Sequence, residues 1–124
     1  MPLPDPETLL PLTPVVLHIL LALADDRQGR HGYAVAREVE ELTDGQIRMG
    51  PGTLYGSIQR MLDASLIEEA GRTRKTRAQA DEDERRRYYR LTAFGRRVLE
   101  LEVHRLAEVV AIARRKQILR PELA

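Results

Sequence analysis

The chain has 124 residues, enough for one domain or for one small domain with an appendage. It contains no cysteine, which excludes disulfides, thiolate metal sites and cysteine nucleophiles, and its formal net charge of +1 points to no particular partner. It starts without a basic segment ahead of an apolar run, and its longest apolar run, Val15 to Ala24, is too short to span a bilayer. We therefore expect a cytoplasmic protein with no membrane partner.

The proline-rich start of the chain predicts an extended, flexible N-terminal arm over residues 1–11. Thr13 and Pro14 then predict an N-cap and the first position of a helix that runs to about Ala24. This helix is apolar around most of its circumference, so it must be buried on several sides. In a chain of this size, we expect a second subunit to cover one of those sides.

Two further helices are expected in the first half of the chain. The second begins at residues 31–33, and the third begins at Pro51 and Gly52 and continues to about Ser65. This order and spacing are typical of the helix-turn-helix unit that binds DNA. Many small helical proteins share the pattern, so it does not establish DNA binding.

The third helix has the composition of a DNA-recognition helix. Residues 45–62 carry no Asp or Glu, so a helix there could lie against a polyanion. An advance of 100° per residue places Leu54, Ile58 and Met61 on one side and Gly56 at the centre of the opposite side. A glycine there would let the backbone approach a groove wall closely, and a tolerated surface glycine is the alternative interpretation.

Polar residues of the third helix suit both parts of a DNA contact. Gln59 and Arg60 are residue types that bind adenine and guanine edges in the major groove. Thr53, Tyr55 and Ser57 carry hydroxyl groups suited to phosphate oxygens near the start of the helix. Packing of Tyr55 partly in the core remains an alternative.

A β-hairpin with a basic loop is expected to follow the three helices. Residues 66–70 and 86–91 resemble strands, and residues 71–85 between them are polar and charged. Residues 72–97 hold 10 Arg and Lys against 4 Asp and Glu, a net of +6, whereas residues 1–71 hold 5 Arg against 11 Asp and Glu, a net of −6. This asymmetry favours a polyanion-binding loop, with a solvated basic loop as the alternative.

These elements predict a mainly α fold with a small β-hairpin, namely a winged helix-turn-helix domain over residues 12–92. A long helix over residues 93–117, capped by Thr92, and a tail over residues 118–124 complete the chain. The long helix repeats apolar residues at alternating steps of four and three, as in a helix that packs against a partner helix. An ordinary core-facing stripe is the alternative. The expected dimerisation residues are Leu17, Leu21, Leu99, Val103, Leu106, Val110 and Ala113.

Several short motifs occur in a fixed order: His31-Gly32-Tyr33, Gly50-Pro51-Gly52-Thr53-Leu54-Tyr55, Arg60-Met61-Leu62, Leu66-Ile67-Glu68-Glu69 and Arg86-Arg87-Tyr88-Tyr89-Arg90-Leu91-Thr92 with Gly95. Over roughly Leu12 to Arg105, the chain resembles the PadR-like transcriptional regulators, in particular the short branch with a single C-terminal helix. The resemblance implies a homodimeric winged-helix regulator, usually a repressor, whose terminal helix packs with the first helix across the dimer.

The resemblance also implies positions for the DNA contacts. It places Tyr33, Thr53, Tyr55 and Ser57 at the DNA face and the hairpin loop on the DNA backbone. The full set of residues that we expect to contact DNA is Tyr33, Arg48, Thr53, Tyr55, Gly56, Ser57, Gln59, Arg60, Arg72, Arg74, Lys75 and Arg77.

Members of the family often respond to small, frequently aromatic compounds held near the dimer interface. This chain has no Trp and one Phe, so a hydrophobic effector site would be mostly aliphatic, lined by His18, Leu21, Phe94 and Val98.

The sequence thus predicts a dimeric DNA-binding regulator of a palindromic operator, with no metal and no cofactor. A winged-helix adaptor that binds another protein is the alternative, since a fold does not determine a function. Enzymatic activity is not expected, because the three histidines are scattered and no nucleophile or phosphate-loop motif is present.

Overall fold

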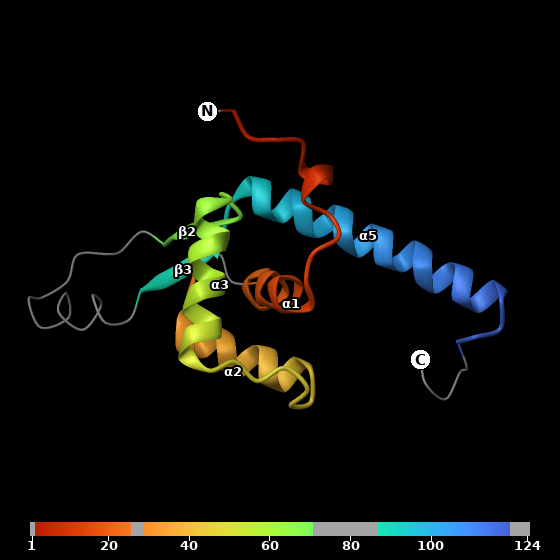
Figure 1. Ribbon diagram of the computed structural model, residues 1–124, viewed down its shortest axis with the longest axis horizontal. Coiled ribbons are helices and arrows are strands. Elements are labelled where there is room, and N and C mark those ends of the chain that lie inside the picture. Colours follow the sequence, from red (N-terminus) through yellow and green to blue (C-terminus); the bar gives the residue numbers. More distant parts are fainter. Residues whose placement is uncertain (1, 26–28, 71–86, 120–124) are drawn as a thin grey trace, which may run out of the picture.

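The computed structural model describes residues 2–25, 29–70 and 87–119, and shows four α-helices with a small sheet at one edge of these residues (Figure 1). This confirms the predicted mainly α fold. The elements in chain order are the 3-10 turn η1 (Pro6–Leu9), α1 (Pro14–Leu23), β1 (Arg30–His31), α2 (Gly32–Leu42), α3 (Pro51–Asp63), β2 (Ile67–Glu69), β3 (Tyr88–Leu91) and α5 (Ala93–Arg115).

Three of the helices begin at a side chain that accepts a hydrogen bond from the first turn. Thr13 accepts from the Val16 amide at the start of α1, and Thr92 accepts from the Gly95 amide at the start of α5. Both caps were predicted from the sequence. The N-cap of α2 is His31, whose Nδ1 accepts from the Ala34 amide at 3.2 Å. Each cap satisfies a backbone amide that has no partner within the helix.

The sheet is antiparallel and has three strands in the order β1-β3-β2. The sequence predicted only the β2–β3 hairpin. The third strand, β1, pairs Arg30 with Tyr89 and His31 with Tyr88. Two residues are too few for an alternating apolar pattern, so no periodicity could reveal this strand. Tyr89, in the central strand, is buried in the core.

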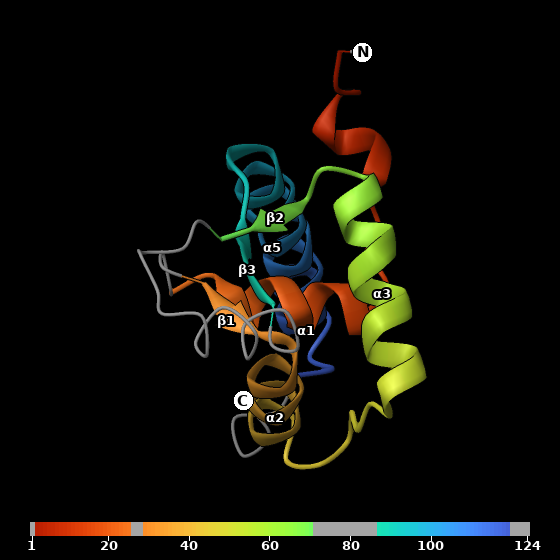
Figure 2. The ribbon, with the colours of Figure 1, turned by 90° about the vertical axis from the view of Figure 1, so that its left-hand side faces the viewer.

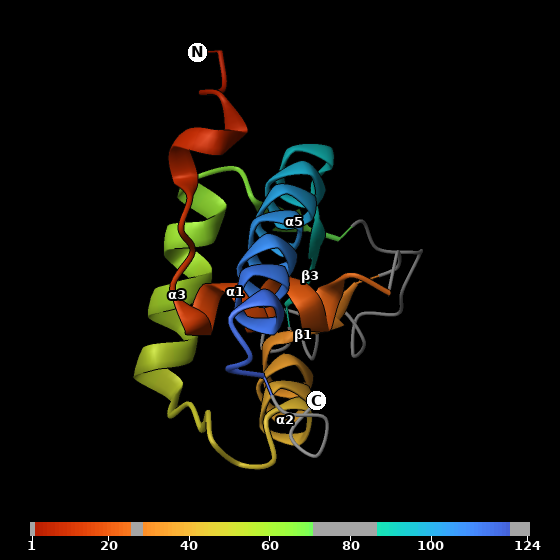
Figure 3. The ribbon, with the colours of Figure 1, turned by 90° about the vertical axis from the view of Figure 1, so that its right-hand side faces the viewer.

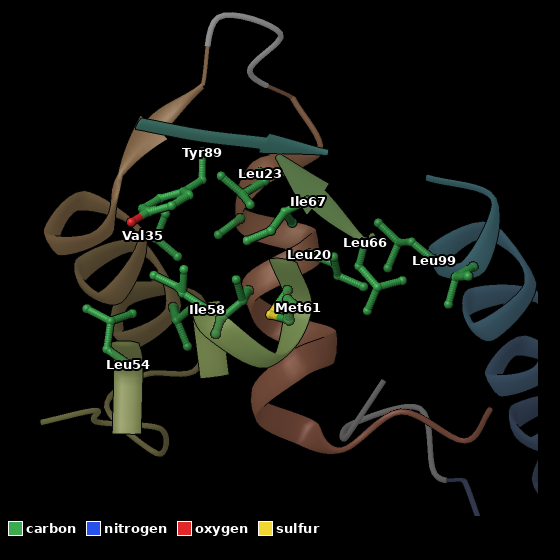
Figure 4. Packing of buried hydrophobic residues seen from close by; sticks show 14 residues of the cluster. Leu20, Leu23, Val35, Leu54, Ile58, Met61, Leu66, Ile67, Tyr89 and Leu99 are labelled. Atoms are coloured by element: carbon green, nitrogen blue, oxygen red, sulfur yellow. The ribbon is translucent and has the colours of Figure 1, made fainter. Parts of the chain in front are cut away.

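The hydrophobic core surrounds α1, which lies between α3 on one side and the sheet on the other (Figures 2 and 3). Ile19, Leu20 and Leu23 of α1 are fully buried among residues of α2, α3, β2 and α5 (Figure 4). The all-round apolar character of α1 is therefore explained mostly by packing within the chain. Leu21 lies on the remaining side and stays exposed.

Gly95, in the first turn of α5, sets how closely this helix approaches the end of α3. A Cβ atom at this position would overlap the carbonyl oxygen of Leu66. Thr92, at the helix cap, also donates from its hydroxyl to the Ser65 carbonyl at 2.6 Å. The start of α5 is thus fixed against the α3–β2 junction, and the helix then runs past α1 and away from the sheet (Figure 1).

The N-terminal segment differs from the extended arm that the sequence predicted. It forms η1 and lies against α5, and Leu9, Leu10 and Leu12 pack on the core. The buried carboxylate of Glu102 in α5 accepts a hydrogen bond from the Leu12 amide at 2.8 Å and hydrogen bonds from Arg105. The prolines exclude a regular α-helix here, but the leucines between them supply apolar surface that the sequence reasoning did not weigh.

Replacing Glu102 by glutamine is expected to remove an acid-sensitive contribution to stability. The hydrogen bond from Arg105 lowers the pKa of the Glu102 carboxyl, outweighing burial, which raises it, and the Leu12 amide also lowers it. A carboxyl with a lowered folded-state pKa stabilises the fold above its unfolded pKa and loses this effect as the pH falls through the folded value. At pH 7, the midpoint of thermal unfolding should therefore be roughly 4 °C lower in Glu102→Gln than in the parent.

The measurement is a thermal unfolding series from pH 7 to pH 2. The parent-minus-variant difference should begin to shrink below about pH 4, where Glu102 becomes protonated in the unfolded state, and should disappear once the pH has also fallen below the lowered pKa of Glu102 in the folded state. A difference that stays constant over the whole series would show that the charge of Glu102 contributes nothing to stability.

No helix within the described ranges has the length and apolar character needed to cross a membrane.

Candidate nucleic-acid interface

The two sides of α3 differ as the helical periodicity predicted. Leu54, Ile58 and Met61 are buried against the core, whereas Thr53, Gln59 and Arg60 are exposed. At Gly56, an added Cβ atom would meet nothing closer than the Arg60 guanidinium, 3.7 Å away. The centre of the outer side is therefore open, and the backbone itself forms the surface there.

The two side chains suited to base edges are held by contacts within the helix. The Gln59 amide donates to the Asp63 carboxylate at 3.0 Å, and Arg60 donates to the Ser57 hydroxyl at 3.2 Å. The Gln59–Asp63 contact lies at the surface, where such a pair exchanges with other partners at small cost, whereas the Arg60–Ser57 contact is part-buried. Both contacts keep Gln59 and Arg60 along α3, and the two side chains themselves remain exposed.

The position of Ser57 corrects the prediction that its hydroxyl would face phosphate. Its side chain is only 1% exposed, and its oxygen accepts the hydrogen bond from Arg60. The advance of 100° per residue that identified the outer side places Ser57 about 60° from Leu54, on the core side. Its effect on the surface is therefore indirect, through the orientation of Arg60.

Two exposed tyrosines extend this surface from α3 to α2. Tyr33 lies in the first turn of α2 and Tyr55 in the second turn of α3, and both are exposed. The close approach of the helices depends on Gly32, where a Cβ atom would lie 3.1 Å from the Tyr55 ring. Tyr55 therefore lies at the surface beside the N-terminus of α2, and the alternative that it packs in the core does not hold.

A cleft of about 290 Å³ separates α2 from the start of α3. Its lining combines apolar and charged residues, namely Tyr33, Ala36, Arg37, Glu40, Arg48, Met49, Pro51, Leu54 and Tyr55. Arg48, predicted to contact DNA, pairs here with Glu40, its Nε lying 3.2 Å from the carboxylate Oε1. Arg37 and Glu40 also line this cleft but were not among the residues predicted to contact DNA, because nothing in the sequence distinguishes them from other charged surface residues of a helix.

The predicted hairpin-loop contacts, Arg72, Arg74, Lys75 and Arg77, lie outside the described residues. At the base of the hairpin, two other arginines pair with β2. Arg87 donates to Glu69 at 3.1 Å, and Arg90 donates to Glu68 at 3.1 Å. These pairs join β3 to β2 across the sheet, so the charges of Arg87 and Arg90 are partly neutralised.

The predicted dimerisation residues fall into two groups. Leu99 is 6% exposed and packs in the core of its own chain, so the structure corrects its assignment to the interface. Val103 and Val110 are 46% and 40% exposed, and Leu106 and Ala113 are half-exposed. On α1, Leu17 is half-buried and Leu21 exposed. The buried residues of α5 end at Glu102, and the rest of the helix extends beyond the other described elements (Figure 1).

The predicted effector residues do not form a single exposed group. Val98 is fully buried in the core, so it could meet a ligand only if the core opened. His18 donates from Nδ1 to the Pro14 carbonyl at 2.7 Å, and Phe94 is half-buried. In the part of the chain that the structure describes, no His, Asp and Glu cluster could hold a metal ion.

Comparison with known proteins assigns the family. The Transcriptional regulator PadR-like family matches residues 19–101. The chain is 34% identical over 91 residues to an uncharacterized 37.1 kDa protein in transposon TN4556 of Streptomyces fradiae; this match covers 73% of the chain and 22% of that protein, so the chain spans about a fifth of that relative. It is 27% identical over 101 residues to an uncharacterized protein X of Lysinibacillus sphaericus, covering 82% of the chain and 83% of that protein. The family match extends from α1 through the packed half of α5, and the chain belongs to the PadR-like family of transcriptional regulators.

Proposed function

We propose that the chain acts in the cytoplasm as a homodimeric, sequence-specific DNA-binding repressor. The observation that carries this proposal is the outer side of α3, where the open backbone at Gly56 is flanked by Gln59 and Arg60. Residues 12–92 would bind DNA, and residues 93–117 would join the two subunits. Repression, rather than activation, follows from the usual activity of the family.

The α3 surface suits the major groove of DNA in both shape and chemistry. The groove admits an α-helix, and the absence of a side chain at Gly56 would let α3 lie deeper in it. Gln59 and Arg60 would then face base edges, with Thr53, Tyr33 and Tyr55 near the phosphates. Apart from Pro51 and Tyr55, the exposed side chains of α3 are polar, which favours DNA over a protein partner.

The exposed distal half of α5 supports a homodimer. Val103 and Val110 leave an apolar stripe on the part of α5 beyond Glu102, in which no described residue is buried. A second copy of α5, together with the exposed Leu21 of α1, would bury this stripe. Two-fold symmetry would then present two α3 helices to half-sites about one helical turn apart, which is why the operator should be palindromic.

Release from DNA by a small hydrophobic effector near the dimer interface completes the proposal. His18 and Phe94 are the partly accessible members of the predicted effector set, and Leu21 lies exposed on the same helix as His18. A compound held between these residues and a partner subunit could change the spacing of the two DNA-binding domains.

The test is to measure, by fluorescence anisotropy over a salt series, how the purified protein binds the DNA upstream of its own gene. A scrambled duplex of the same length and composition is the control. We expect operator affinity to exceed scrambled affinity by at least about 10³-fold at physiological salt. Equal affinity for both duplexes and for genome-selected fragments would overturn sequence-specific binding, and no binding at low salt would favour the adaptor function.

A further inference from the structure

The cleft between α2 and α3 contains an acidic residue where DNA phosphates are expected. Glu40 lines this cleft together with Tyr33 and Tyr55, and its carboxylate pairs with Arg48 at 3.2 Å. The two side chains are 47% and 75% exposed, so neither is needed for the core. A carboxylate at a phosphate-binding surface weakens binding by repulsion, and it needs an explanation other than stability.

We propose that Glu40 is a specificity-determining residue that holds Arg48 away from DNA unless a phosphate is correctly placed in the cleft. This inference rests on the proposed DNA-binding function. The Glu40–Arg48 pair would persist in complexes with non-operator DNA and would exchange for an Arg48–phosphate contact at the operator.

The strength of the pair suits such an exchange. An exposed ion pair contributes between about 0 and 1 kcal/mol, so a well-placed phosphate can displace it. On non-operator DNA, base contacts from α3 do not fix the register, and phosphates do not occupy one position in the cleft. On such DNA, Arg48 therefore stays paired with Glu40, and the complex lacks the contact between Arg48 and a phosphate.

Glu41 provides a matched control for the charge of Glu40. It is the next residue of α2, is also exposed, and lines the adjacent cleft beside Arg48 and Asp44. Across the described ranges, no ion pair of Glu41 is present. Glu40→Gln and Glu41→Gln therefore remove the same charge from the same helix, but only Glu40→Gln releases Arg48.

The experiment measures operator and scrambled affinities over a salt series for Glu40→Gln, Glu41→Gln, Arg48→Gln and the Glu40→Gln, Arg48→Gln double variant. Glu40→Gln should raise the affinity for the scrambled duplex roughly 3- to 10-fold at low salt. The slope of log affinity against log salt concentration for that duplex should become steeper by about 0.9, because one more phosphate is neutralised. Operator affinity should rise by less than about threefold, with an unchanged slope, because Arg48 already contacts phosphate there. Specificity therefore falls.

In the Arg48→Gln background, the Glu40→Gln substitution should no longer steepen the slope. The inference would be overturned if Glu40→Gln and Glu41→Gln changed the affinity for the scrambled duplex equally, or if the effect of Glu40→Gln persisted without Arg48. Glu40 would then act only through its negative charge, not through its pairing with Arg48. Unchanged scrambled affinity in Glu40→Gln would overturn it as well. If the parent protein itself does not prefer the operator, the proposed function fails, and this outcome is distinct from failure of the Glu40–Arg48 exchange.

Discussion

Replacing Gly56 by leucine is expected to weaken operator binding strongly while leaving the subunit folded. An added Cβ atom meets only the Arg60 guanidinium at 3.7 Å, so a leucine side chain would have just this flexible group to displace as it projects from α3. It would hold the helix away from the groove floor and withdraw Gln59 and Arg60 from the bases. Each such base contact contributes about 1–3 kcal/mol, so operator affinity should fall on the order of 100-fold or more. Fluorescence anisotropy and circular dichroism measure the two expectations.

The companion variant Gly56→Ala separates a DNA-contacting glycine from a tolerated one. Alanine in a helix interior is favoured over glycine by about 1 kcal/mol, so this variant should unfold at a higher temperature than the parent. Its operator affinity should nevertheless fall, by less than that of Gly56→Leu. A more stable variant with unchanged operator affinity would mean that Gly56 lies outside the interface.

Placing glutamates at Val103 and Val110 together is expected to convert the proposed dimer into monomers. The two residues are 46% and 40% exposed in the single subunit, so the substitutions should change its own packing little. Across a two-fold axis, however, they would bring like charges together in an apolar seam. Without the second half-site, operator affinity should fall by about 10²- to 10⁴-fold. Light scattering with size-exclusion chromatography gives the mass, and anisotropy gives the affinity.

Ile112→Glu is the matched control for the dimer interface. Ile112 is 48% exposed on the same helix but lies about 180° from Val103 around it. This variant should remain dimeric and bind the operator as the parent does. Dissociation by Ile112→Glu with retention of the dimer in the Val103 and Val110 variant would place the interface on the opposite side of α5.

Local signals in the sequence were sufficient for most of the helical fold. Thr13 and Thr92 were recognisable as caps because their side chains act on amides three residues away. The core side of α3 followed from the spacing of Leu54, Ile58 and Met61, which depends only on the helical repeat. The site residues on the outer side were inferred by the same repeat, since they lie opposite these three.

Features that depend on contacts between distant segments could not be predicted in this way. Strand β1 exists because Arg30 and His31 meet β3, which lies more than fifty residues later in the chain. The N-terminal segment is ordered by Glu102, ninety residues away from Leu12. Leu99 satisfied the seam pattern and also the core pattern, and only the packing of α5 on α1 decides between them.

The junction of β1 and α2 has a mechanical consequence. His31 belongs to the sheet through its pairing with Tyr88 and also caps α2, and the next residue, Gly32, touches Tyr55 of α3. No linker therefore separates the sheet from α2, and Gly32 lets α3 lie close beside that junction. In the proposed dimer, we expect a signal that changes DNA binding to alter mainly the distance between the two subunits, through movement at α5 and α1.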